Sequence, residues 1–326
     1  MSVYIAGTGS YLPEKILTNA DLEKLVETSD EWIRVRTGIE ERHLAAADEC
    51  PSDMAKVAAE RAMKAAGITG ADLSAIVVAT STADYTFPNT ACLLQRSLGC
   101  KNILCYDLCA ACSGLIYALE TASALIRSNK KYRYVLVCGA EKLSSIVDWS
   151  DRNTCVLFGD GAGAFVLENR PGEDKFPVSC LGADGNYSET LMLPAGSSRH
   201  PASHATIDNR MHYIHMAGRE TFKLAIKAMV ESSNRVLSDA EVAPDEVALV
   251  IPHQANRRII QAVAQRLTVP PERVFDNVNR YGNTSASSIG IAFDDAVRSG
   301  RLRRGDLVLL TAFGSGLTWG AMLLRY

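Results

Sequence analysis

The sequence predicts an α/β protein in which helices and sheets are stacked in layers. Short runs rich in valine and isoleucine, bounded by glycine, proline, aspartate or serine, alternate along the chain with longer amphipathic stretches. Such alternation is typical of buried strands connected by helices. The length of 326 residues, 47% of them hydrophobic, allows a large core in either two domains or one large domain of two similar halves.

The individual elements are predicted from the spacing of apolar residues. Near-continuous apolar runs indicate strands that are buried on both faces, and they occupy residues 74–82, 102–109, 132–141, 163–168, 246–253 and 306–314. Apolar residues at spacings of three and four indicate helices that pack against a sheet, and these occupy residues 53–67, 90–99, 114–128, 220–237 and 257–267. We therefore expect strands and helices to alternate over most of the chain.

A weak internal similarity predicts two related halves. The stretch "AMKAAGITGADLSAIVVATST" resembles "RVLSDAEVAPDEVALVIPHQ", because each contains a helix end, a turn with an acidic residue and a buried strand. The polar segment "NRPGEDKFPV" lies between the two stretches. We place the boundary within this segment and expect halves at residues 1–173 and 174–326.

The composition argues against several classes of protein. A net charge of −3 gives no reason to expect a nucleic-acid or membrane partner. We expect no signal peptide or membrane span, because no apolar run is long enough. Nine scattered cysteines then predict reduced thiols and a cytoplasmic location. The glycine-rich stretches "AGTGSYLP" and "FGDGAGAFVLE" do not fit a dinucleotide-binding loop, so we expect tight turns there.

Three cysteines, Cys105, Cys109 and Cys112, have a C-x3-C-x2-C spacing that permits three interpretations. An iron–sulfur cluster is disfavoured, because an extended strand separates Cys105 from Cys109 by about 13 Å at roughly 3.3 Å per residue. A dithiol of Cys109 and Cys112 is sterically possible, although Ala-Ala is an unusual spacer for a redox pair. The third interpretation makes Cys112 a lone nucleophile and treats Cys105 and Cys109 as core residues.

Cys112 lies where a predicted strand ends and a predicted helix begins. The free backbone N–H groups at the helix start favour the thiolate, which is the nucleophilic form. The neighbours are small and leave room for an acyl group; they are Ala110, Ala111, Ser113 and Gly114. A buried cysteine without a role is the alternative, and this turn alone does not decide between the two.

A cysteine nucleophile in acyl chemistry needs a base or hydrogen-bond donors that the fold brings close to it. His253 ends a predicted strand in "VALVIPHQANRRII", and Asn283 lies in a glycine-flanked turn in "YGNTSASSIGIAF". Both positions are element ends, where α/β proteins place their sites. Taken singly, a core histidine and a turn asparagine are the better interpretations.

Taken together, the segments "CAACSG", "IPHQAN" and "YGNTSASS" resemble β-ketoacyl-acyl-carrier-protein synthase III, a family of the thiolase superfamily. The segments "GSYLPEKILTNADLE", "SDEWIRVRTGIEER", "FGDGAGA" and "AFGSGLTWGAMLLRY" are similar to the same family, so the resemblance runs from end to end. It implies a thiolase-like five-layered α-β-α-β-α fold of two similar halves, and a homodimer.

The resemblance also implies a reaction that starts fatty acid synthesis. Cys112 would take an acyl group from an acyl-CoA primer, expected to be acetyl-CoA. Malonyl-acyl carrier protein would then lose CO2 and attack this acyl-enzyme to give 3-ketoacyl-acyl carrier protein. CoA thioesters are substrates in this reaction, and we expect no cofactor and no metal. A related condensing enzyme of secondary metabolism is the alternative.

The family's donor groups transfer to four positions. His253 and Asn283 would donate hydrogen bonds to the malonyl thioester oxygen as negative charge develops on it. The backbone N–H groups of Cys112 and Ser315 would do the same for the tetrahedral intermediates. Ser315 departs from the Gly-Gly-Gly of the family, and its Cβ could crowd the site. Asparagine at position 283 disfavours an elongating synthase, and the lack of a second cysteine in "FGSG" disfavours a degradative thiolase.

Binding residues are also implied by the resemblance. The nucleotide end of CoA would meet Trp32 by stacking and Arg36 by charge pairing, with Thr28 nearby and Arg152 on the other side of the base. The pantetheine tunnel would be lined by Gly218, Phe222, Ala255 and Asn256. Phe87 would reach across the dimer to close the partner's acyl pocket. Without the resemblance, an exposed arginine-rich helix with one core tryptophan is as good an interpretation.

A basic stripe predicts where the carrier protein docks. Arg219, Lys223 and Lys227 recur at four-residue spacing on one predicted helix. Together with Arg257 and Arg258 they could bind an acidic carrier protein, although such stripes are usually solvated faces. A histidine-rich segment that contains His200, His204, His212 and His215 is interpreted as a surface loop and not as a zinc site.

Overall fold

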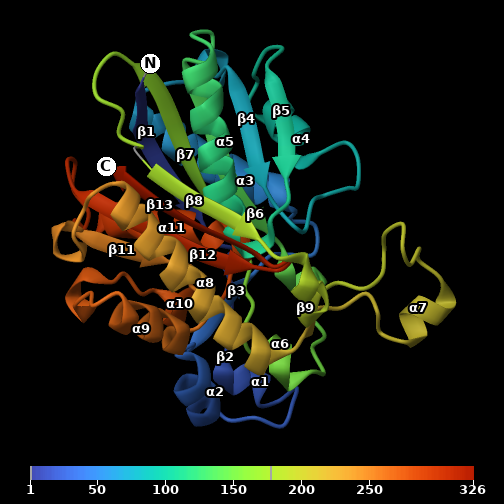
Figure 1. The fold of residues 1–326 in the computed structure, drawn as a ribbon. Helices are drawn as coiled ribbons and strands as arrows, with labels where there is room; N and C mark the ends of the chain where they lie inside the picture. The colour runs from blue at the N-terminus through green and yellow to red at the C-terminus, as the bar shows by residue number, and fades with distance from the viewer. Residues whose placement is uncertain (1, 177) are drawn as a thin grey trace.

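Two mixed β-sheets form the framework of the computed structural model, which describes residues 2–176 and 178–326 (Figure 1). The first sheet has the order β1-β7-β6-β4-β5, and its strands are β1 (Ser2–Tyr11), β4 (Ala75–Ala79), β5 (Leu104–Leu108), β6 (Tyr134–Glu141) and β7 (Gly161–Arg170). The second has the order β11-β12-β13-β8, with strands β8 (Val178–Ala183), β11 (Leu249–Pro252), β12 (Leu307–Gly314) and β13 (Thr318–Arg325).

The two sheets repeat one topology. In the first, β4 is parallel to β6, while β7 is antiparallel to both β6 and β1. In the second, β11 is parallel to β12, and β13 is antiparallel to both β12 and β8. An isolated parallel bridge between Val250 and Val274 stands where the first sheet has β5. The predicted similarity of the two halves therefore extends to strand order and direction.

Helices cover both faces of each sheet and produce five layers. The central layer is α5 (Gly114–Ser128) and α11 (Ser288–Arg298), which contact strands of both sheets. The outer face of the first sheet is covered by α3 (Pro51–Ala66), with α4 (Thr90–Ser97) beside it. The outer face of the second is covered by α8 (Gly218–Asp239) and α9 (Arg257–Arg266). The predicted five-layered α-β-α-β-α fold is confirmed.

The core is continuous through the central layer. Phe293 of α11 packs edge-on against Phe165 of β7 at 5.0 Å between ring centroids, and against Tyr326 after β13 at 5.3 Å. Edge-to-face aromatic pairs at these distances contribute about 0.5–1.5 kcal/mol each beyond the burial of their area. This row of rings connects the two sheets through the helix layer between them.

The prediction of tight turns at the two glycine-rich stretches is wrong for the glycines that lie in strands. Gly161 and Gly163 of "FGDGAGAFVLE" lie within β7. "AGTGSYLP" was expected to form a tight turn, but Gly7 and Gly9 lie within strand β1. A Cβ at either position would lie 2.3 Å from a backbone carbonyl oxygen of α3. These glycines therefore let the helix approach the strand closely. Helix α3 itself begins at Pro51 and ends at Ala66, and it is capped by Gly67, whose φ of 70° suits a residue without a side chain.

Smaller elements surround the layers. Toward the lower end of the molecule in Figure 1 lies the antiparallel pair of β2 (Lys15–Thr18) and β3 (Glu41–Leu44). Near it are four short helices, α1 (Asn19–Leu22), α2 (Asp30–Thr37), α6 (Arg152–Cys155) and α10 (Val278–Tyr281). The pair β9 (Leu191–Met192) and β10 (His215–Met216) brackets an arm that carries α7 (His204–Asp208) and projects from the body (Figure 1). In the described part of the chain, no helix combines the length and apolarity that a membrane span needs.

The histidine-rich segment lies on this arm. His200, His204 and His215 are exposed, while the His212 ring nitrogen lies 2.9 Å from the Thr206 hydroxyl. Apart from residues 1 and 177, which are not described, no three His, Cys, Asp or Glu side chains gather as metal ligands. The segment is a surface loop with one short helix, as predicted.

Candidate active site

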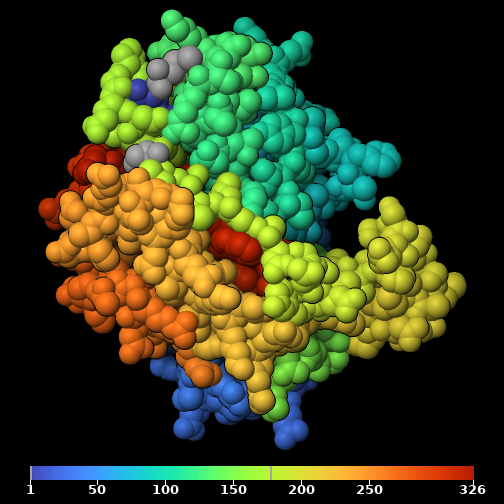
Figure 2. Space-filling model, viewed as in Figure 1, coloured from blue at the N-terminus to red at the C-terminus, as the bar shows by residue number. Residues whose placement is uncertain are grey.

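A cavity of about 520 Å³ opens between the two halves. Cys112, His253 and Asn283 all line it, although they are up to 171 residues apart in sequence (283 − 112 = 171). Figure 2 shows this face, where the red C-terminal segment is visible in a hollow between the orange and lime-coloured segments. The wall is mostly apolar, and its few polar groups come from strand and helix ends. Pockets of this kind bind organic ligands and hold them by a small number of directed hydrogen bonds.

Cys112 lies in the turn η2 (Ala111–Ser113) between β5 and α5. Ala111 has a φ of 45°, a left-handed conformation that is rare for a residue with a side chain. The end of β12 packs tightly against this turn, because a Cβ on Gly314 would lie 2.6 Å from the Cys112 backbone nitrogen. Ser113 Oγ and Thr318 Oγ1 also lie 2.8 and 2.9 Å from the Ala110 carbonyl oxygen. The second half of the chain thus holds the turn of the first.

The thiol of Cys112 is protonated at rest. Only 8% of the residue is exposed, and burial raises the pKa of the thiol to about 12, while a hydrogen bond from Ser285 lowers it. The backbone N–H of Cys112 lowers this pKa, in the direction expected of a helix start, but burial raises it by more. The desolvation of a charged sulfur outweighs the attraction of the backbone N–H groups. Deprotonation therefore has to accompany attack on a substrate.

The other cysteines of the ladder separate as their secondary structure requires. Cys105 lies on β5 and packs, partly buried, against the core between the first sheet and α3. Cys109 was expected in the core as well, and that prediction is wrong: the residue is exposed and lines the same cavity as Cys112. The chain leaves the sheet after Leu108, so Cys109 is no longer covered by neighbouring strands.

His253 directly follows β11, and its backbone N–H donates to the Thr311 carbonyl at 2.8 Å. Burial lowers the pKa of the imidazole to about 3, so the ring is neutral. Ser288 Oγ lies 2.6 Å from Nδ1 and 3.4 Å from the Gln254 backbone N–H, which donates to it. The serine proton is therefore free to be donated to Nδ1. When Ser288 donates to Nδ1, the proton of His253 is on Nε2, as a hydrogen-bond donor.

Asn283 is fixed by three hydrogen bonds. Its backbone N–H donates to Leu157 O at 2.8 Å, and its carbonyl accepts from Gly159 N at 3.0 Å. The side-chain Oδ1 accepts from the Ser285 backbone N–H at 2.8 Å. Because the oxygen is occupied, the Nδ2 amide group is left as the free donor of this side chain. His253 and Asn283 thus both supply N–H donors to one cavity.

Ser315 also lines the cavity. Its Oγ donates to the Leu191 carbonyl of β9, so the side chain is held against the cavity wall. The hydrogen bonds among the described residues leave the backbone N–H groups of Cys112 and Ser315 without a carbonyl acceptor. Gly314, which precedes Ser315, packs closely on the Cys112 backbone, because a Cβ on it would lie 2.6 Å from Cys112 N.

Comparisons with known proteins agree with this geometry. Residues 106–185 match the family described as 3-Oxoacyl-[acyl-carrier-protein (ACP)] synthase III, and residues 237–326 match its C-terminal part. Beta-ketoacyl-[acyl-carrier-protein] synthase III of Aquifex aeolicus is 51% identical over 326 residues, which is 100% of both chains. The protein of that name from Caldanaerobacter subterraneus subsp. tengcongensis is 49% identical over 322 residues, covering 99% of this chain and 97% of the relative. The chain belongs to the β-ketoacyl-acyl-carrier-protein synthase III family.

Solved structures of the synthase III family have the same fold. The crystal structure from Aquifex aeolicus superposes with a TM-score of 0.91 at 50% identity and covers 100% of both chains. That from Pseudomonas aeruginosa gives a TM-score of 0.92 at 39% identity, with 100% of this chain and 98% of that chain covered. A priming β-ketosynthase from the R1128 polyketide biosynthetic pathway is 31% identical, with a TM-score of 0.92 and coverage of 99% and 96%.

The residues predicted to bind CoA fall into two groups. Those predicted for the pantetheine tunnel all line the cavity, and they are Gly218, Phe222, Ala255 and Asn256. The other group lies outside the cavity lining, on α2, on α6 and in the segment before α2. Here the guanidinium carbons of Arg36 and Arg152 lie 5.4 and 4.9 Å from the centre of the Trp32 ring. Thr28 Oγ1 is buried and has no hydrogen-bond partner among the described residues.

The predicted docking residues differ in how free they are. Arg219, Lys223 and Lys227 are exposed along α8. Arg258 is exposed as well, with its guanidinium 5.3 Å from the Phe222 ring. Arg257 is already paired with Asp276 at 2.6 Å. A charge that is held in this way contributes less to a docking surface than its free neighbours.

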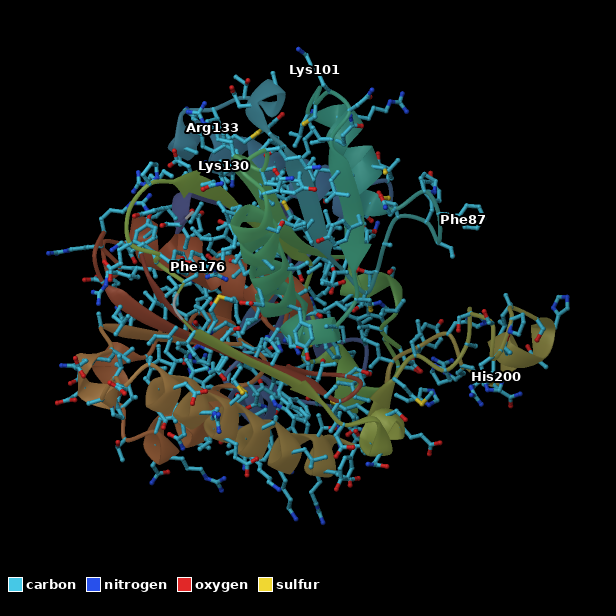
Figure 3. The ribbon with its side chains drawn as sticks, turned by 45° about the horizontal axis from the view of Figure 1, so that its top comes forward. Phe87, Lys101, Lys130, Arg133, Phe176 and His200 are labelled. Carbon is cyan, nitrogen blue, oxygen red and sulfur yellow. The ribbon has the colours of Figure 1, made fainter. Side chains whose placement is uncertain are left out.

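Phe87 lies in the loop between β4 and α4, and 82% of its surface is exposed. Figure 3 shows its ring at the edge of the molecule, pointing away from the body. In one chain, therefore, Phe87 does not line the cavity that contains Cys112.

Sequence reasoning missed the residues that hold the site together. Ser285 and Ser288 orient Asn283 and His253, and Glu141 is buried beside the same turn. The two serines were visible in "YGNTSASS", where the density of hydroxyl groups at a helix start was a usable signal. The sequence gives no sign that Glu141 is buried, because a single glutamate at the end of an apolar run is usually a surface residue.

Proposed function

We propose that this chain joins an acyl group from acyl-CoA to malonyl-acyl carrier protein by decarboxylative Claisen condensation, and so initiates fatty acid synthesis. The products are 3-ketoacyl-acyl carrier protein, CoA and CO2. The observation that carries the proposal is the presence of Cys112, His253 and Asn283 on one cavity in a chain of the synthase III family. The polypeptide is thus an acyltransferase that uses CoA thioesters as substrates, and we infer no resident cofactor.

The first half-reaction is acyl transfer to Cys112. The sulfur attacks the thioester carbon of the acyl-CoA, and the oxygen becomes an oxyanion. The backbone N–H groups of Cys112 and Ser315 are the donors for this oxygen, which is supported by their lack of other carbonyl acceptors. A preorganised pair of donors of this kind lowers the barrier by several kcal/mol. CoA leaves, and the acyl group stays on Cys112.

The second half-reaction is decarboxylation and condensation. Loss of CO2 from malonyl-acyl carrier protein places negative charge on the thioester oxygen, and Nε2–H of His253 and Nδ2–H of Asn283 are proposed to stabilise it. A neutral imidazole suits this role, because it donates a hydrogen bond without transferring its proton. The carbanion then attacks the acyl group and releases Cys112.

The proposed CoA path runs from Trp32 to the cavity. Two observations support a nucleotide site there. Arg36 and Arg152 lie near the Trp32 ring, on which a base can stack. The buried Thr28 hydroxyl has no partner among the described residues, and a buried hydroxyl needs one. Phe222, Ala255 and Asn256 support the tunnel between this site and Cys112.

We infer a homodimer, in which Phe87 closes the partner's acyl pocket. Support comes from the exposed Phe87 and Tyr85 side chains, and from Leu104 on the edge strand β5, which is 39% exposed. Exposed apolar edges of this kind are normally covered. The division into residues 1–173 and 174–326 is supported by the end of β7 at Arg170 and the start of β8 at Val178. A cytoplasmic location is part of the proposal and is supported by the free state of all nine cysteines.

Mass spectrometry after incubation with a panel of acyl-CoAs tests the function. We expect one acyl increment that is lost in Cys112→Ala and kept in Cys109→Ala. Cys109 is the matched control, because it lines the same cavity and is more exposed. The most efficient acyl-CoA identifies the primer. Labelling of Cys109 in place of Cys112 would overturn the assignment.

The carrier surface is tested separately. Lys223→Glu and Arg258→Glu are expected to weaken use of malonyl-acyl carrier protein and to leave loading from acyl-CoA unchanged. Lys64→Glu, an exposed lysine on α3, is the control for a general change of charge. Equal loss of both half-reactions would contradict a docking role.

The alternative is a condensing enzyme of secondary metabolism. The 31% identity to a priming β-ketosynthase of a polyketide pathway supports it, while the relatives at 49–51% support fatty acid synthesis. Preference for short unbranched primers and for the fatty acid carrier protein would exclude the alternative.

A further inference from the structure

Arg42 is a buried arginine that the two half-reactions described above do not use. It lies on β3, and none of its surface is exposed. Within the described part of the chain its guanidinium donates to Leu17 O at 3.1 Å, to Asn19 Oδ1 at 2.9 Å and to Val156 O at 2.8 Å. All three acceptors are uncharged oxygens. A buried charge that is bonded only by neutral groups costs free energy, so stability alone does not explain this arginine.

On one side Arg42 holds the segment that fixes Asn283. The carbonyl of Val156 accepts from the guanidinium, and the next carbonyl, that of Leu157, accepts from the Asn283 backbone N–H at 2.8 Å. Gly159 N donates back to Asn283 O at 3.0 Å. The backbone that anchors Asn283 is therefore itself anchored on Arg42.

The stem of Arg42 packs against two glycines of the same contact. A Cβ on Gly159 would lie 3.1 Å from the Arg42 Cβ, and one on Gly282 would lie 3.4 Å from it. Gly282 directly precedes Asn283 and has a φ of 65°. Both sides of the pairing that holds Asn283 thus rest on this one side chain.

On its other side Arg42 is connected to α2 through Asn19. Asn19 is buried, and its Oδ1 accepts from Arg42. Its Nδ2 donates to Asp30 Oδ1 and to Ile39 O, both at 2.8 Å. Asp30 begins α2, and Ile39 lies two residues after the end of this helix. One amide group therefore fixes both ends of the helix that carries the proposed nucleotide site.

We propose that Arg42 is a positioning residue that holds Asn283 at the cavity and, through Asn19, fixes α2 relative to it. A guanidinium suits this role, because its donors diverge in one plane and can bind oxygens on separate segments. The inference rests on the proposed parts of Asn283 in decarboxylation and of α2 in CoA binding. Loss of Arg42 impairs both of these and leaves the turn that carries Cys112 in place.

Arg42→Met tests the contact with Asn283, because it keeps an apolar stem and removes all three hydrogen bonds. The kcat for decarboxylation of malonyl-acyl carrier protein should fall about tenfold or more, as expected for a misplaced donor. Loading of Cys112 at saturating acyl-CoA should stay within about twofold, while its KM rises. The double variant Arg42→Met/Asn283→Ala should decarboxylate no more slowly than Asn283→Ala, because Arg42 acts through Asn283. Arg42→Lys retains the charge without the fork, and it should show the same separation if Arg42→Met does not fold.

Asn19→Ala separates the two sides of Arg42. It removes both hydrogen bonds to α2 and leaves the contact with Val156, so the KM for acyl-CoA should rise about threefold or more while decarboxylation stays within about twofold. Arg127→Met is the matched control, since Arg127 of α5 donates to Asp174 at 2.7 Å and to Phe176 O at 2.6 Å. This control should lower stability without changing the ratio of the two half-reactions.

Amide hydrogen exchange gives a readout that does not depend on activity. The Asn283 amide should exchange faster in Arg42→Met and not in Arg127→Met, because the segment that accepts its hydrogen bond is released. Unchanged exchange in Arg42→Met would overturn the proposal, as would a proportional fall of both half-reactions or an additive loss in the double variant. If Asn283→Ala decarboxylates at the unaltered rate, the proposed function of that donor fails instead, and the exchange of Asn283 then decides whether Arg42 positions it.

Discussion

The two halves of the molecule have the same strand order but carry different chemistry at equivalent turns. In the first half, η2 follows β5 and precedes α5, and it contains Ala111 at a φ of 45° and then Cys112. In the second half, the turn η7 (Ser285–Ser287) precedes α11 and contains Ser285 at a φ of 49° and then Ala286. The same unusual backbone thus presents a thiol on one side and an alanine on the other. A repeated scaffold fixes positions in space, and the side chains at those positions decide the reaction.

Each turn is held by the opposite half. Gly314 of β12 leaves room for the Cys112 backbone, and Gly139 of β6 leaves room for Ala286. In the candidate site, therefore, each turn packs against a strand of the opposite half. Predictions that separate the two turns test this comparison directly.

The largest expected effect is a separation of the two half-reactions. Cys112→Ala should abolish acyl loading and keep decarboxylation of malonyl-acyl carrier protein. His253→Ala and Asn283→Ala should keep loading and lower decarboxylation by about 10²–10³-fold each, as for the loss of one oxyanion donor. Mass spectrometry measures loading, and released CO2 measures decarboxylation. Loss of loading in His253→Ala would show that the halves do not divide the chemistry in this way.

Substitution of Gly314 and Gly139 tests whether each turn depends on the strand of the opposite half. Gly314→Ala and Gly139→Ala should each lower the free energy of unfolding by about 1–3 kcal/mol, because the added Cβ would lie too close to backbone atoms of the opposite half. Gly314→Ala should impair loading more, and Gly139→Ala should impair condensation more. Denaturant unfolding and the two assays measure this. Gly185→Ala, where nothing lies within 4 Å of the added Cβ, serves as the control.

A smaller effect is expected from the serine that orients the imidazole. Ser288→Ala should slow condensation about tenfold. A buried hydrogen bond contributes roughly 1 kcal/mol, and without it the proton of His253 is no longer held on one ring nitrogen. Loading should be unchanged. Ser287→Ala is a matched control, since Ser287 Oγ bonds only the Thr284 carbonyl, at 2.8 Å, in the same turn. Equal effects of the two variants on condensation would remove the argument for an oriented tautomer.

The smallest effect on condensation is expected from pH. Because the folded-state pKa of His253 is about 3, well below its ordinary 6.5, condensation should show no imidazole titration between pH 5 and 8. Between pH 6.5 and about 3, the unfolded chain binds a proton that the folded chain does not bind. Stability should therefore fall as pH falls through that window, and His253→Asn should reduce this fall. Unfolding curves at several pH values measure it.

Much of this protein could be predicted from its sequence. The buried strands and the helices between them were visible as apolar runs and three–four spacings, because each of these signals arises from neighbours along the chain. The positions of Cys112, His253 and Asn283 at element ends were equally local. The glycines of β1 were misinterpreted as turns, since a close approach of α3 to a strand depends on residues fifty positions away.

The tertiary structure decided the properties of those residues. Burial sets the thiol of Cys112 and the imidazole of His253 in their neutral forms, and for Cys112 it outweighs the backbone N–H that favours a thiolate. The tertiary structure also exposed Cys109, and it placed Glu141 and Ser285 from opposite halves near the Cys112 thiol. Sequence determines which groups the chain carries and where its strands end. Desolvation and hydrogen bonding act between segments that only folding brings together, so the protonation states and the orientation of the donors belong to the folded structure.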